Sequence, residues 1–399
     1  YTLTFTQTTP PTPGQNTKDP KVIPIAVGLL NDAGAEIHAT KICEVTDEVH
    51  KFRFTGLDAK PIPSINRGFS APIILERDQT NSERAFLLAN DTDPFNKWEA
   101  GRALARDVMI RMVTEDCAPD QAYLDALIKV ACVDTLSPDF KALAFRGPSN
   151  DDIQQALFDG VITPDPTKIY LTARSLMQSL AQATQDLLPR IYAEMQVDGP
   201  YRPEAEDAAK RSWSNTALGL LSCLDGGAQA ARQYEAADNM TQQISALNCL
   251  LREEVGEDQN QAFYEQWKAD RLVVDKWFAM QVLHAKMETA GPKAQALTQH
   301  PDFTMTNPNR FRAVFGSLGG NAAGFHDPSG EGYRVMAAAL ITLDKINPQT
   351  TARMSTVFET WKRYDADRQG MMREALTRIK NTDGLSGDTS EMVTRILGN

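Results

Sequence analysis

The sequence has 399 residues, of which 42% are hydrophobic, and this length and composition suffice for a packed core and favour more than one domain. The formal net charge is -11, the pI is near 5.1, and no basic stretch interrupts the acidic background. These properties argue against binding to the phosphate backbone of DNA or RNA, so we expect no nucleic-acid partner.

Cysteine usage and hydropathy indicate a soluble chain in a reducing compartment. The five cysteines are scattered along the sequence, and no C-x-x-C pair occurs. This pattern favours a cytoplasmic location. No apolar run approaches the roughly 18 residues of a membrane span, and no basic-then-apolar leader is present. We therefore expect no membrane partner.

Residues 1–78 show the pattern of short strands separated by turns. The opening YTLTFTQ alternates Leu3 and Phe5 with threonines, VIPIAVGLL is followed by the turn NDAG, and KFRFTG alternates Phe52 and Phe54 with basic residues. We predict a small antiparallel β-sandwich domain in 1–78, which at this size would depend on a neighbour for stability. Because the chain opens inside a strand without a methionine, we expect it to be a piece of a longer polypeptide.

Residues 79–399 change to a helical spacing of apolar residues that continues to the C-terminus. Asp93 followed by Pro94 is typical of a helix start. Further helices are predicted in TPDPTKIYLTARSLMQSLAQATQDLL, PEAEDAAKRSWSNTALGLLSCL, AADNMTQQISALNCLLREE, DRLVVDKWFAMQVLHAKM and SGDTSEMVTRILGN. Consecutive helices with short polar loops and no strands predict an irregular α-helical solenoid, a superhelix of the HEAT or armadillo type. The predicted fold class is therefore mainly α.

A search for catalytic and metal-binding motifs finds none. No two of the five histidines stand three to five residues apart, and the patterns H-E-x-x-H, G-x-S-x-G, Walker A and G-x-G-x-x-G are absent. Cys223 and Cys249 sit among leucines in predicted helices, so we interpret them as packing residues. The glycine-rich GSLGGNAAGFH fits a ligand loop and the end of a helix equally well. We predict no catalytic residue and no metal ligand.

The stretch TNPNRFRAVFGS begins a helix with unusual clarity and then carries two arginines. Asn307 is the predicted N-cap and Pro308 the first helical residue. At 100° per residue, Arg310 and Arg312 flank the apolar stripe of this helix on opposite sides. The predicted stripe consists of Phe311, Val314, Phe315 and Leu318.

A second helix with the same start is predicted at Asn347 and Pro348, and Arg353 flanks its stripe. The predicted stripe consists of Met354, Val357, Phe358 and Trp361. From periodicity alone, the simpler interpretation of all these arginines is that they snorkel along the surface or pair with carboxylates on adjacent helices.

Several segments resemble the C-terminal half of bacterial aminopeptidase N, a family of alanine-preferring zinc metallopeptidases of the gluzincin class. YTLTFTQTTPPTPGQ resembles the start of that family's third domain, a β-sandwich, and SINRGFSAPIILE resembles its exit into the helical fourth domain. The following collinear matches to the fourth domain are DPFNKWEAGR, EAADNMTQQISAL, LVVDKWFAMQ, FTMTNPNRFR, GFH with a Gly-Tyr pair shortly after, KRYDADRQGMM and LSGD.

The resemblance implies a four-domain parent enzyme whose zinc ligands, general-base glutamate, amino-terminus-binding glutamate and transition-state tyrosine all precede the β-sandwich. Since those residues are not in this chain, we expect zinc only in the parent and no catalysis by this chain alone. The chain is then the non-catalytic C-terminal portion of an enzyme that removes N-terminal residues from peptides. Its implied partners are the catalytic domain of the same polypeptide and short peptides.

The resemblance also assigns a place to two of the arginines. In the family, the helical domain is a curved bowl that caps the catalytic domain and shapes the cavity through which peptides reach it. The arginines that match Arg312 and Arg353 face this cavity, where a guanidinium can meet a peptide carbonyl or C-terminal carboxylate. Arg310 would then be the structural member of its pair.

Two other functions stay open from the sequence. One is a stand-alone helical-repeat module that binds peptides or proteins without catalysis. The other is an independent enzyme with an unrecognised site, and this alternative is the weakest because no cluster of titratable residues supports it. An exposed apolar patch formed by Leu3, Phe5 and VIPIAVGLL would indicate a covering domain, whereas a polar surface there would favour the stand-alone module.

Overall fold

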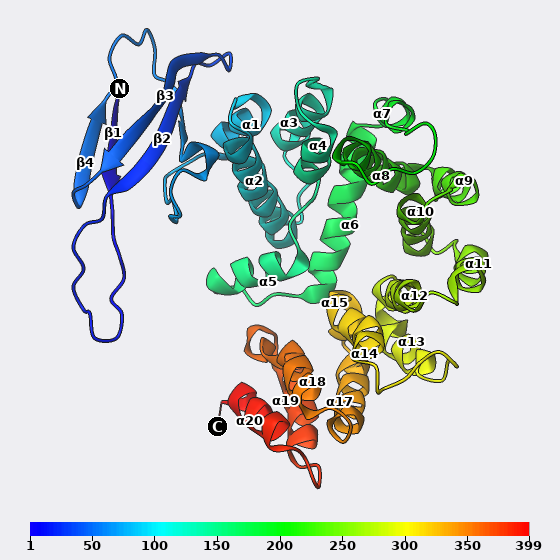
Figure 1. Ribbon diagram of the computed structural model, residues 1–399. Coiled ribbons are helices and arrows are strands. Elements are labelled where there is room, and N and C mark those ends of the chain that lie inside the picture. The colour runs from blue at the N-terminus through cyan, green and yellow to red at the C-terminus, as the bar shows by residue number, and fades with distance from the viewer. Residues whose placement is uncertain (399) are drawn as a thin grey trace. The chain divides into compact units, whose positions relative to one another are not determined.

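The computed structural model describes residues 1–398, and its internal contacts divide these residues into two compact units (Figure 1). The first unit combines Tyr1–Val108 with Ala118–Pro148, and the second combines Met109–Cys117 with the chain from Ser149 onward. Each unit has hydrophobic clusters of its own, so each has an independent core.

The first unit opens with two small antiparallel sheets. β1 pairs with β4, and the second sheet has the order β3-β2-β5. The predicted antiparallel β-structure is confirmed, but β3 and β5 had no strand prediction of their own, because β3 is largely exposed and β5 contains a proline, as edge strands do. The strands are β1 (Thr2–Thr6), β2 (Ile23–Leu30), β3 (Glu36–Val45), β4 (Val49–Arg53) and β5 (Ile62–Ile65).

The core of the sheets is centred on β2, which is buried from Ile25 to Leu30. Leu3 and Phe5 are half-buried and pack against this core, and Leu30 joins a second cluster with Leu87. Most of these residues are therefore covered within the unit itself, but Val22 at the start of VIPIAVGLL is 71% exposed. The face as a whole is neither a continuous apolar patch nor a polar surface, so it favours neither a covering domain nor a stand-alone module.

Four helices follow the sheets, the second of which extends into the other unit. They are α1 (Asn81–Asn90), α2 (Pro94–Glu115), α3 (Gln121–Cys132) and α4 (Pro138–Ala144). The predicted start of α2 is confirmed, since the Asp93 carboxylate accepts a hydrogen bond of 2.9 Å from the backbone N–H of Asn96.

The second unit is helical throughout its described residues. Its α-helices are α5 (Asn150–Asp159), α6 (Pro166–Ala183), α7 (Leu188–Glu194), α8 (Ala205–Asp225), α9 (Ala228–Ala236), α10 (Met240–Arg252), α11 (Glu257–Trp267), α12 (Arg271–Leu283), α13 (Ala290–Leu297), α14 (Pro308–Phe311), α15 (Ser317–Gly320), α16 (Ala322–Phe325), α17 (Glu331–Asp344), α18 (Pro348–Ser355), α19 (Ala366–Lys380) and α20 (Gly387–Leu397). A π-helical segment, η3 (Arg312–Gly316), joins α14 to α15. The 3-10 turns of the chain are η1 (Arg67–Phe69), η2 (Met287–Thr289), η4 (Thr356–Phe358) and η5 (Trp361–Arg363).

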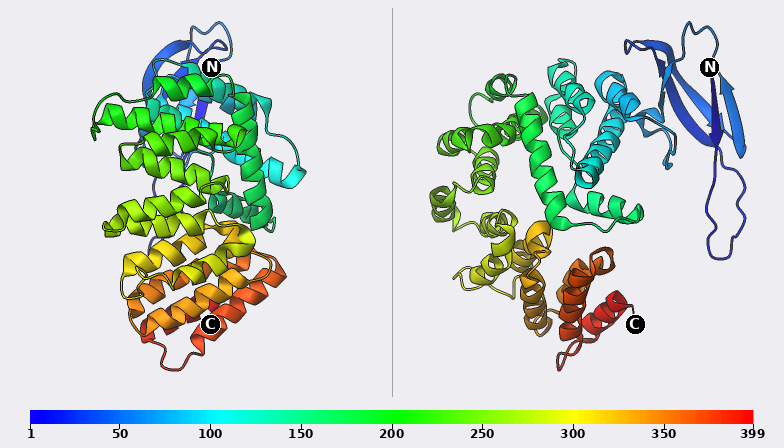
Figure 2. Two further views of the ribbon diagram at one scale, coloured as in Figure 1. Left: turned by 90° about the vertical axis from the view of Figure 1, so that its right-hand side faces the viewer. Right: turned by 180° about the vertical axis from the view of Figure 1, so that it is seen from behind.

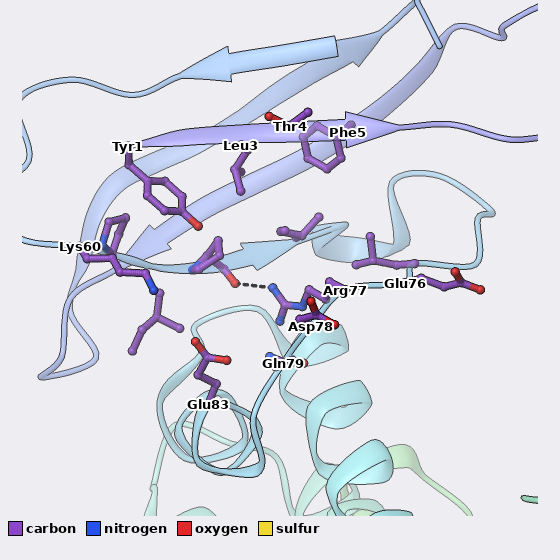
Figure 3. Close-up of a pocket in the computed structure, with 15 residues that line it drawn as sticks. Tyr1, Leu3, Thr4, Phe5, Lys60, Glu76, Arg77, Asp78, Gln79 and Glu83 are labelled. Atoms are coloured by element: carbon purple, nitrogen blue, oxygen red, sulfur yellow. Dashed lines mark hydrogen bonds between the residues drawn. The ribbon is translucent and has the colours of Figure 1, made fainter. Parts of the chain in front are cut away.

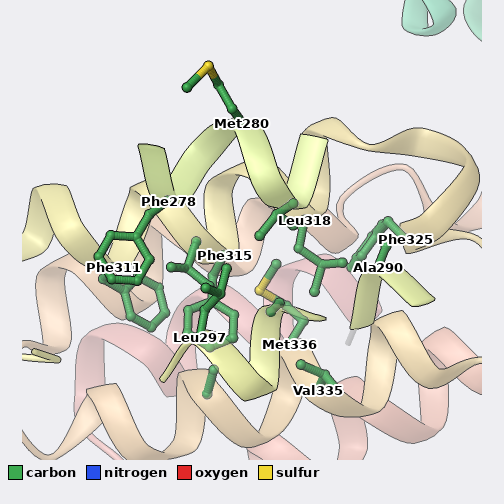
Figure 4. Packing of buried hydrophobic residues seen from close by; sticks show 14 of the residues in the cluster. Phe278, Met280, Ala290, Leu297, Phe311, Phe315, Leu318, Phe325, Val335 and Met336 are labelled. Atoms are coloured by element: carbon green, nitrogen blue, oxygen red, sulfur yellow. The ribbon is translucent and has the colours of Figure 1, made fainter. Parts of the chain in front are cut away.

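These helices stack as the predicted solenoid. α7 packs against α8, α9 against α10 and α11 against α12, and from α7 to α20 the helices follow one another around an arc (Figure 1, Figure 2). One continuous hydrophobic cluster extends from α8 to α20, and part of it lies between α12, the segment that carries Phe311 and Phe315, and α17 (Figure 4). Because each helix buries its apolar stripe against its neighbours, the stack has one shared core.

Two predicted helices are shorter than the sequence suggested. The helix that begins at Pro308 passes into the π-helical η3 after one turn, and α18 ends at Ser355 before the turns η4 and η5. In α18, the hydroxyls of Thr351 and Ser355 bond back to carbonyls four residues earlier, at 3.0 and 2.9 Å. Bonds of this kind slightly destabilise and often bend helices.

Candidate functional site

The start of α14 is built as the sequence predicted. The Asn307 side chain accepts hydrogen bonds from the backbone N–H groups of Asn309 and Arg310, and Pro308 is the first helical residue. The predicted stripe is also confirmed, because all four of its side chains are at most 2% exposed. They are Phe311, Val314, Phe315 and Leu318.

Arg310 is enclosed by the fold. Its residue is 4% exposed, its Nε donates to the Asp275 carboxylate at 2.5 Å, and its Nη1 donates to the carbonyl of Asp302. The guanidinium also lies 4.7 Å from the ring centroid of Phe278 on α12. An ion pair, a carbonyl and an aromatic face leave this charge no access to a ligand, as expected for a structural residue.

Arg312 differs from Arg310 although only one residue separates them. It is exposed, and its guanidinium has a single hydrogen bond, of 3.5 Å, to Asn309 on the same turn. It is also the first residue of the π-helical η3, a type of irregularity that frequently occurs at functional sites. The Arg312 charge is therefore available to a binding partner.

Arg353 lies in the last turn of α18 and is likewise exposed. Within residues 1–398, its side chain makes no hydrogen bond or ion pair. A methyl group placed on Gly316 would lie 3.7 Å from the Cβ of Arg312 and 4.0 Å from the Cε of Met354. The two segments that carry the predicted site arginines therefore lie close together at Gly316 and Met354.

A pocket of about 250 Å³ lies in the first unit, at a place for which no sequence motif predicted one (Figure 3). It is lined by Leu3 and Phe5 of β1, and Arg77 points into it while donating to the carbonyl of Pro63 at 3.0 Å. Burial lowers the pKa of Arg77, whereas the carboxylate of Glu83 opposes this shift. Glu83 itself is occupied in the cap of α1, so the pocket presents no set of groups with an evident reaction.

Comparisons with known proteins cover the chain from end to end. Residues 1–78 match the Ig-like fold of a family described as a domain of unknown function, DUF3458, and residues 81–398 match its ARM-repeat part, DUF3458_C. The chain belongs to this family. It also matches the C-terminal part of aminopeptidase N, which confirms the resemblance.

The aminopeptidase N relatives are substantially longer than the chain. The protein of Caulobacter vibrioides is 37% identical over 387 residues, which are 94% of this chain and 44% of the relative, and that of Escherichia coli is 32% identical over 100% and 47%. The crystal structure of Legionella pneumophila aminopeptidase A in complex with aspartic acid has a TM-score of 0.81 at 28% identity and covers 94% of this chain and 45% of that one. The chain therefore spans about half the length of these relatives.

The DUF3458 chain does not provide a metal site in its described part. Among residues 1–398, no group of three or more His, Cys, Asp or Glu side chains could hold a metal ion. The described residues therefore offer no set of ligands for the zinc that the resemblance implies for the parent enzyme. Within residues 1–398, no helix combines the length and apolarity that a membrane span requires.

The cysteines and glycines singled out in the sequence lie in packed helices. All five cysteines are free, and burial raises the pKa of Cys249, which lies on α10, and of Cys223 on α8. A thiol whose pKa is raised is a poor nucleophile at neutral pH. In GSLGGNAAGFH, a methyl group on Gly324 would lie 2.3 Å from the Cβ of Ala290, so this glycine allows two helices to approach closely.

Arg67 lies in the loop after β5, within the segment SINRGFSAPIILE, and contacts the residues directly before the segment DPFNKWEAGR. Arg67 is 7% exposed and donates to the hydroxyl of Ser64 at 2.9 Å and to the carboxylates of Glu36 and Asp91 at 3.0 and 3.4 Å. Its guanidinium lies against the backbone of Gly28, where a methyl group would come within 2.1 Å of it. We call this cluster the Arg67 joint. No sequence pattern predicts it, because Glu36 and Asp91 are 31 and 24 residues away from Arg67.

Proposed function

We propose that the chain is the non-catalytic C-terminal portion of a zinc-dependent aminopeptidase that removes N-terminal residues from peptides. In this proposal it caps the catalytic domain of the same polypeptide and shapes the cavity through which short peptides enter. The observation that carries the proposal is the end-to-end match to aminopeptidase N relatives of about twice the length. Zinc then belongs to the catalytic domain, the chain alone is inactive, and the enzyme works in the cytoplasm.

Arg312 and Arg353 are the proposed peptide-binding residues of this portion. Both guanidiniums are exposed, and among residues 1–398 neither pairs with a carboxylate. A guanidinium donates two parallel hydrogen bonds to a carboxylate, so each can bind the C-terminus or a backbone carbonyl of a peptide. The contrast with Arg310, whose charge is neutralised by Asp275, supports the assignment.

A stand-alone binding module is the second candidate. It is favoured by the burial of β2 from Ile25 to Leu30, because these residues have no apolar surface left for a further domain to cover. In that case Arg312 and Arg353 would bind peptides on the solenoid without any reaction.

The mass of the native polypeptide separates the two candidates. An antibody raised against this chain would detect a species of about twice its 44.1 kDa in the source cell if the aminopeptidase proposal is correct. A species near 44.1 kDa would instead mean that the cell makes this portion without a catalytic domain, and the binding module would become the leading function.

The role of the arginines is tested by kinetics of the full polypeptide. We expect Arg312→Ala and Arg353→Ala to raise KM for hexapeptides about three- to tenfold, because a charge-assisted hydrogen bond is lost. The KM for alanine p-nitroanilide should stay unchanged. Arg334→Ala is the matched control, since Arg334 is an exposed arginine of the same unit that is paired with Glu331. Unchanged peptide kinetics in both variants would refute the assignment.

A further inference from the structure

Two parts of the second unit that are far apart in sequence are bonded to each other. Tyr364 donates its hydroxyl proton to Gln154 at 2.6 Å across 210 residues, and Arg363 pairs with Asp151 at 2.7 Å across 212 residues. We call this contact the latch. Its members are Asp151, Gln154 and Asp165 from α5 and the start of α6, and Arg363, Tyr364 and Arg368 from η5 and the start of α19.

The centre of the latch is buried and its rim is exposed. Tyr364 and Gln154 are each 3% exposed, so their hydrogen bond is shielded from water. At the rim, the Asp151 side chain is 75% exposed, so its ion pair with Arg363 contributes little to stability. The buried tyrosine–glutamine bond is therefore the part whose loss leaves unsatisfied polar groups.

A second layer of the latch lies around His326, which follows α16. The rings of His326 and Tyr364 are 4.3 Å apart, and the Nδ1 of His326 is 2.8 Å from the hydroxyl of Tyr333 on α17. Arg368 donates its Nε proton to the carbonyl of His326 at 2.8 Å and reaches Asp165, the N-cap of α6, at 3.6 Å. The end of α16 is thus tied to α6, α17 and α19.

The two segments that carry Arg312 and Arg353 are continuous in sequence with His326 and with Tyr364, respectively. Arg312 lies in η3, which continues through α15 and α16 to His326. Arg353 lies in α18, which continues through η4 to η5 and Tyr364. The two segments also meet midway, because a methyl group on Gly319 would lie 2.7 Å from the side chain of Val357 in η4.

We propose that Gln154 and Tyr364 are positioning residues that hold the Arg312 and Arg353 segments in a fixed relation to each other. The inference rests on the proposed function, because it assigns the latch to the peptide-binding arginines. A guanidinium that has shifted by about 1 Å loses much of a bidentate contact, so the latch sets peptide affinity without touching the peptide. It has no direct effect on the reaction at the scissile bond.

The chain offers a matched control for the tyrosine–glutamine bond. Tyr192 donates to Gln233 at 2.9 Å, which links α7 to α9 within 41 residues, in a part of the stack that lies apart from α14, α15 and α18 (Figure 1). Tyr364→Phe and Tyr192→Phe each remove one hydroxyl and keep the ring. Gln154→Leu is the second latch variant, so that the result does not depend on a single substitution.

Hydrogen exchange of the 399-residue chain gives the first readout. We expect Tyr364→Phe and Gln154→Leu to increase exchange about fivefold at 312–316 and 350–363, which corresponds to the loss of one buried hydrogen bond. Tyr192→Phe should change exchange only around α7 and α9. If the latch variants leave 312–316 and 350–363 unchanged, the latch does not position the arginines, and the inference is wrong whether or not the proposed function holds.

Peptide kinetics of the full polypeptide give the second readout. We expect the latch variants to raise KM for hexapeptides about threefold with kcat for alanine p-nitroanilide unchanged, and Tyr192→Phe to change neither. If the latch variants exchange faster but leave KM unchanged, while Arg312→Ala does raise KM, the inference about the latch is wrong and the proposed function stands. No KM change in the Arg312→Ala and Arg353→Ala variants would overturn the proposed function and the inference together.

Discussion

The Arg67 joint and the segment that begins at Asn307 both place arginines where two elements meet, but they use the charge differently. Arg67 is enclosed and bonded to hydroxyls and carboxylates from three directions, and Arg310 is enclosed in the same way by Asp275 and Phe278. Arg312 is exposed and has one weak bond. The comparison separates arginines that hold the fold together from arginines that are available to a ligand.

Removing Arg67 is the substitution with the largest expected effect. Arg67→Ala would leave the fully buried carboxylate of Asp91 without its cationic partner, and we expect a loss of about 3–5 kcal/mol of unfolding free energy. Urea unfolding followed by hydrogen exchange in the first unit measures this loss. An additional Asp91→Ala change should restore part of it, because the unpaired charge is gone.

Arg102→Ala serves as the control for the joint, since Arg102 forms an exposed ion pair with Glu99 in the same unit. Its expected cost is about 0–1 kcal/mol. If Arg67→Ala lowered the unfolding free energy no more than Arg102→Ala does, the Arg67 joint would stabilise the fold no more than an exposed ion pair. Arg67 would then not differ from Arg312 as a structural residue.

Removing Arg310 comes next in magnitude. Arg310→Ala would take away the partner of Asp275 and the cation above Phe278, but the Asp275 side chain is 17% exposed and can recover some hydration. We therefore expect a loss of about 2–3 kcal/mol, smaller than at Arg67. The measurement is urea unfolding of the second unit. A cost as small as that of an exposed arginine would show that burial alone does not identify a structural arginine.

Local rules predicted the features that depend on a few neighbouring residues. The caps at Asp93 and Asn307 follow from hydrogen-bonding geometry within one turn. The stripe from Phe311 to Leu318 was predicted from a 3.6-residue period, and its residues are buried although Val314 and Phe315 lie in the π-helical η3. The solenoid follows from the succession of such helices. These parts of the fold were therefore available from the sequence.

Features that depend on tertiary contacts were not available from the sequence. The pairing of Arg67 with Asp91 spans 24 residues and that of Tyr364 with Gln154 spans 210, and no periodicity encodes either distance. The π-helical segment that starts at Arg312 departs from the assumed 100° per residue. The angle that placed Arg312 on one flank of the apolar stripe therefore does not hold there. The distinction between Arg310 and Arg312 came from the family resemblance, not from periodicity.

The buried His326 makes the second unit sensitive to acid. Burial, followed by the positive charge of Arg368, lowers the pKa of His326 from 6.5 to about 3. Between these values the unfolded chain binds a proton that the folded chain does not, so stability falls as the pH drops from about 6.5 towards 3. We expect the second unit to lose about 1–2 kcal/mol from this group by pH 5, measured by urea unfolding across pH.

His326→Gln tests the source of this pH dependence, because the glutamine amide can still bond to Tyr333 but does not titrate. The variant should flatten the decline between pH 6.5 and 5, and His38→Gln in the first unit should leave it unchanged. An equally steep decline in the His326→Gln variant would assign the acid sensitivity to other groups.

The smallest expected effect on stability belongs to the two proposed site residues. Arg312→Ala and Arg353→Ala remove exposed side chains that no carboxylate holds, so each should change the unfolding free energy by less than about 0.5 kcal/mol. A residue that costs nothing to remove from the fold but raises KM for peptides serves binding. A loss of 2 kcal/mol or more, as at Arg310, would instead place these arginines with Arg67 among the residues that hold the fold together, and the comparison between the two regions would fail.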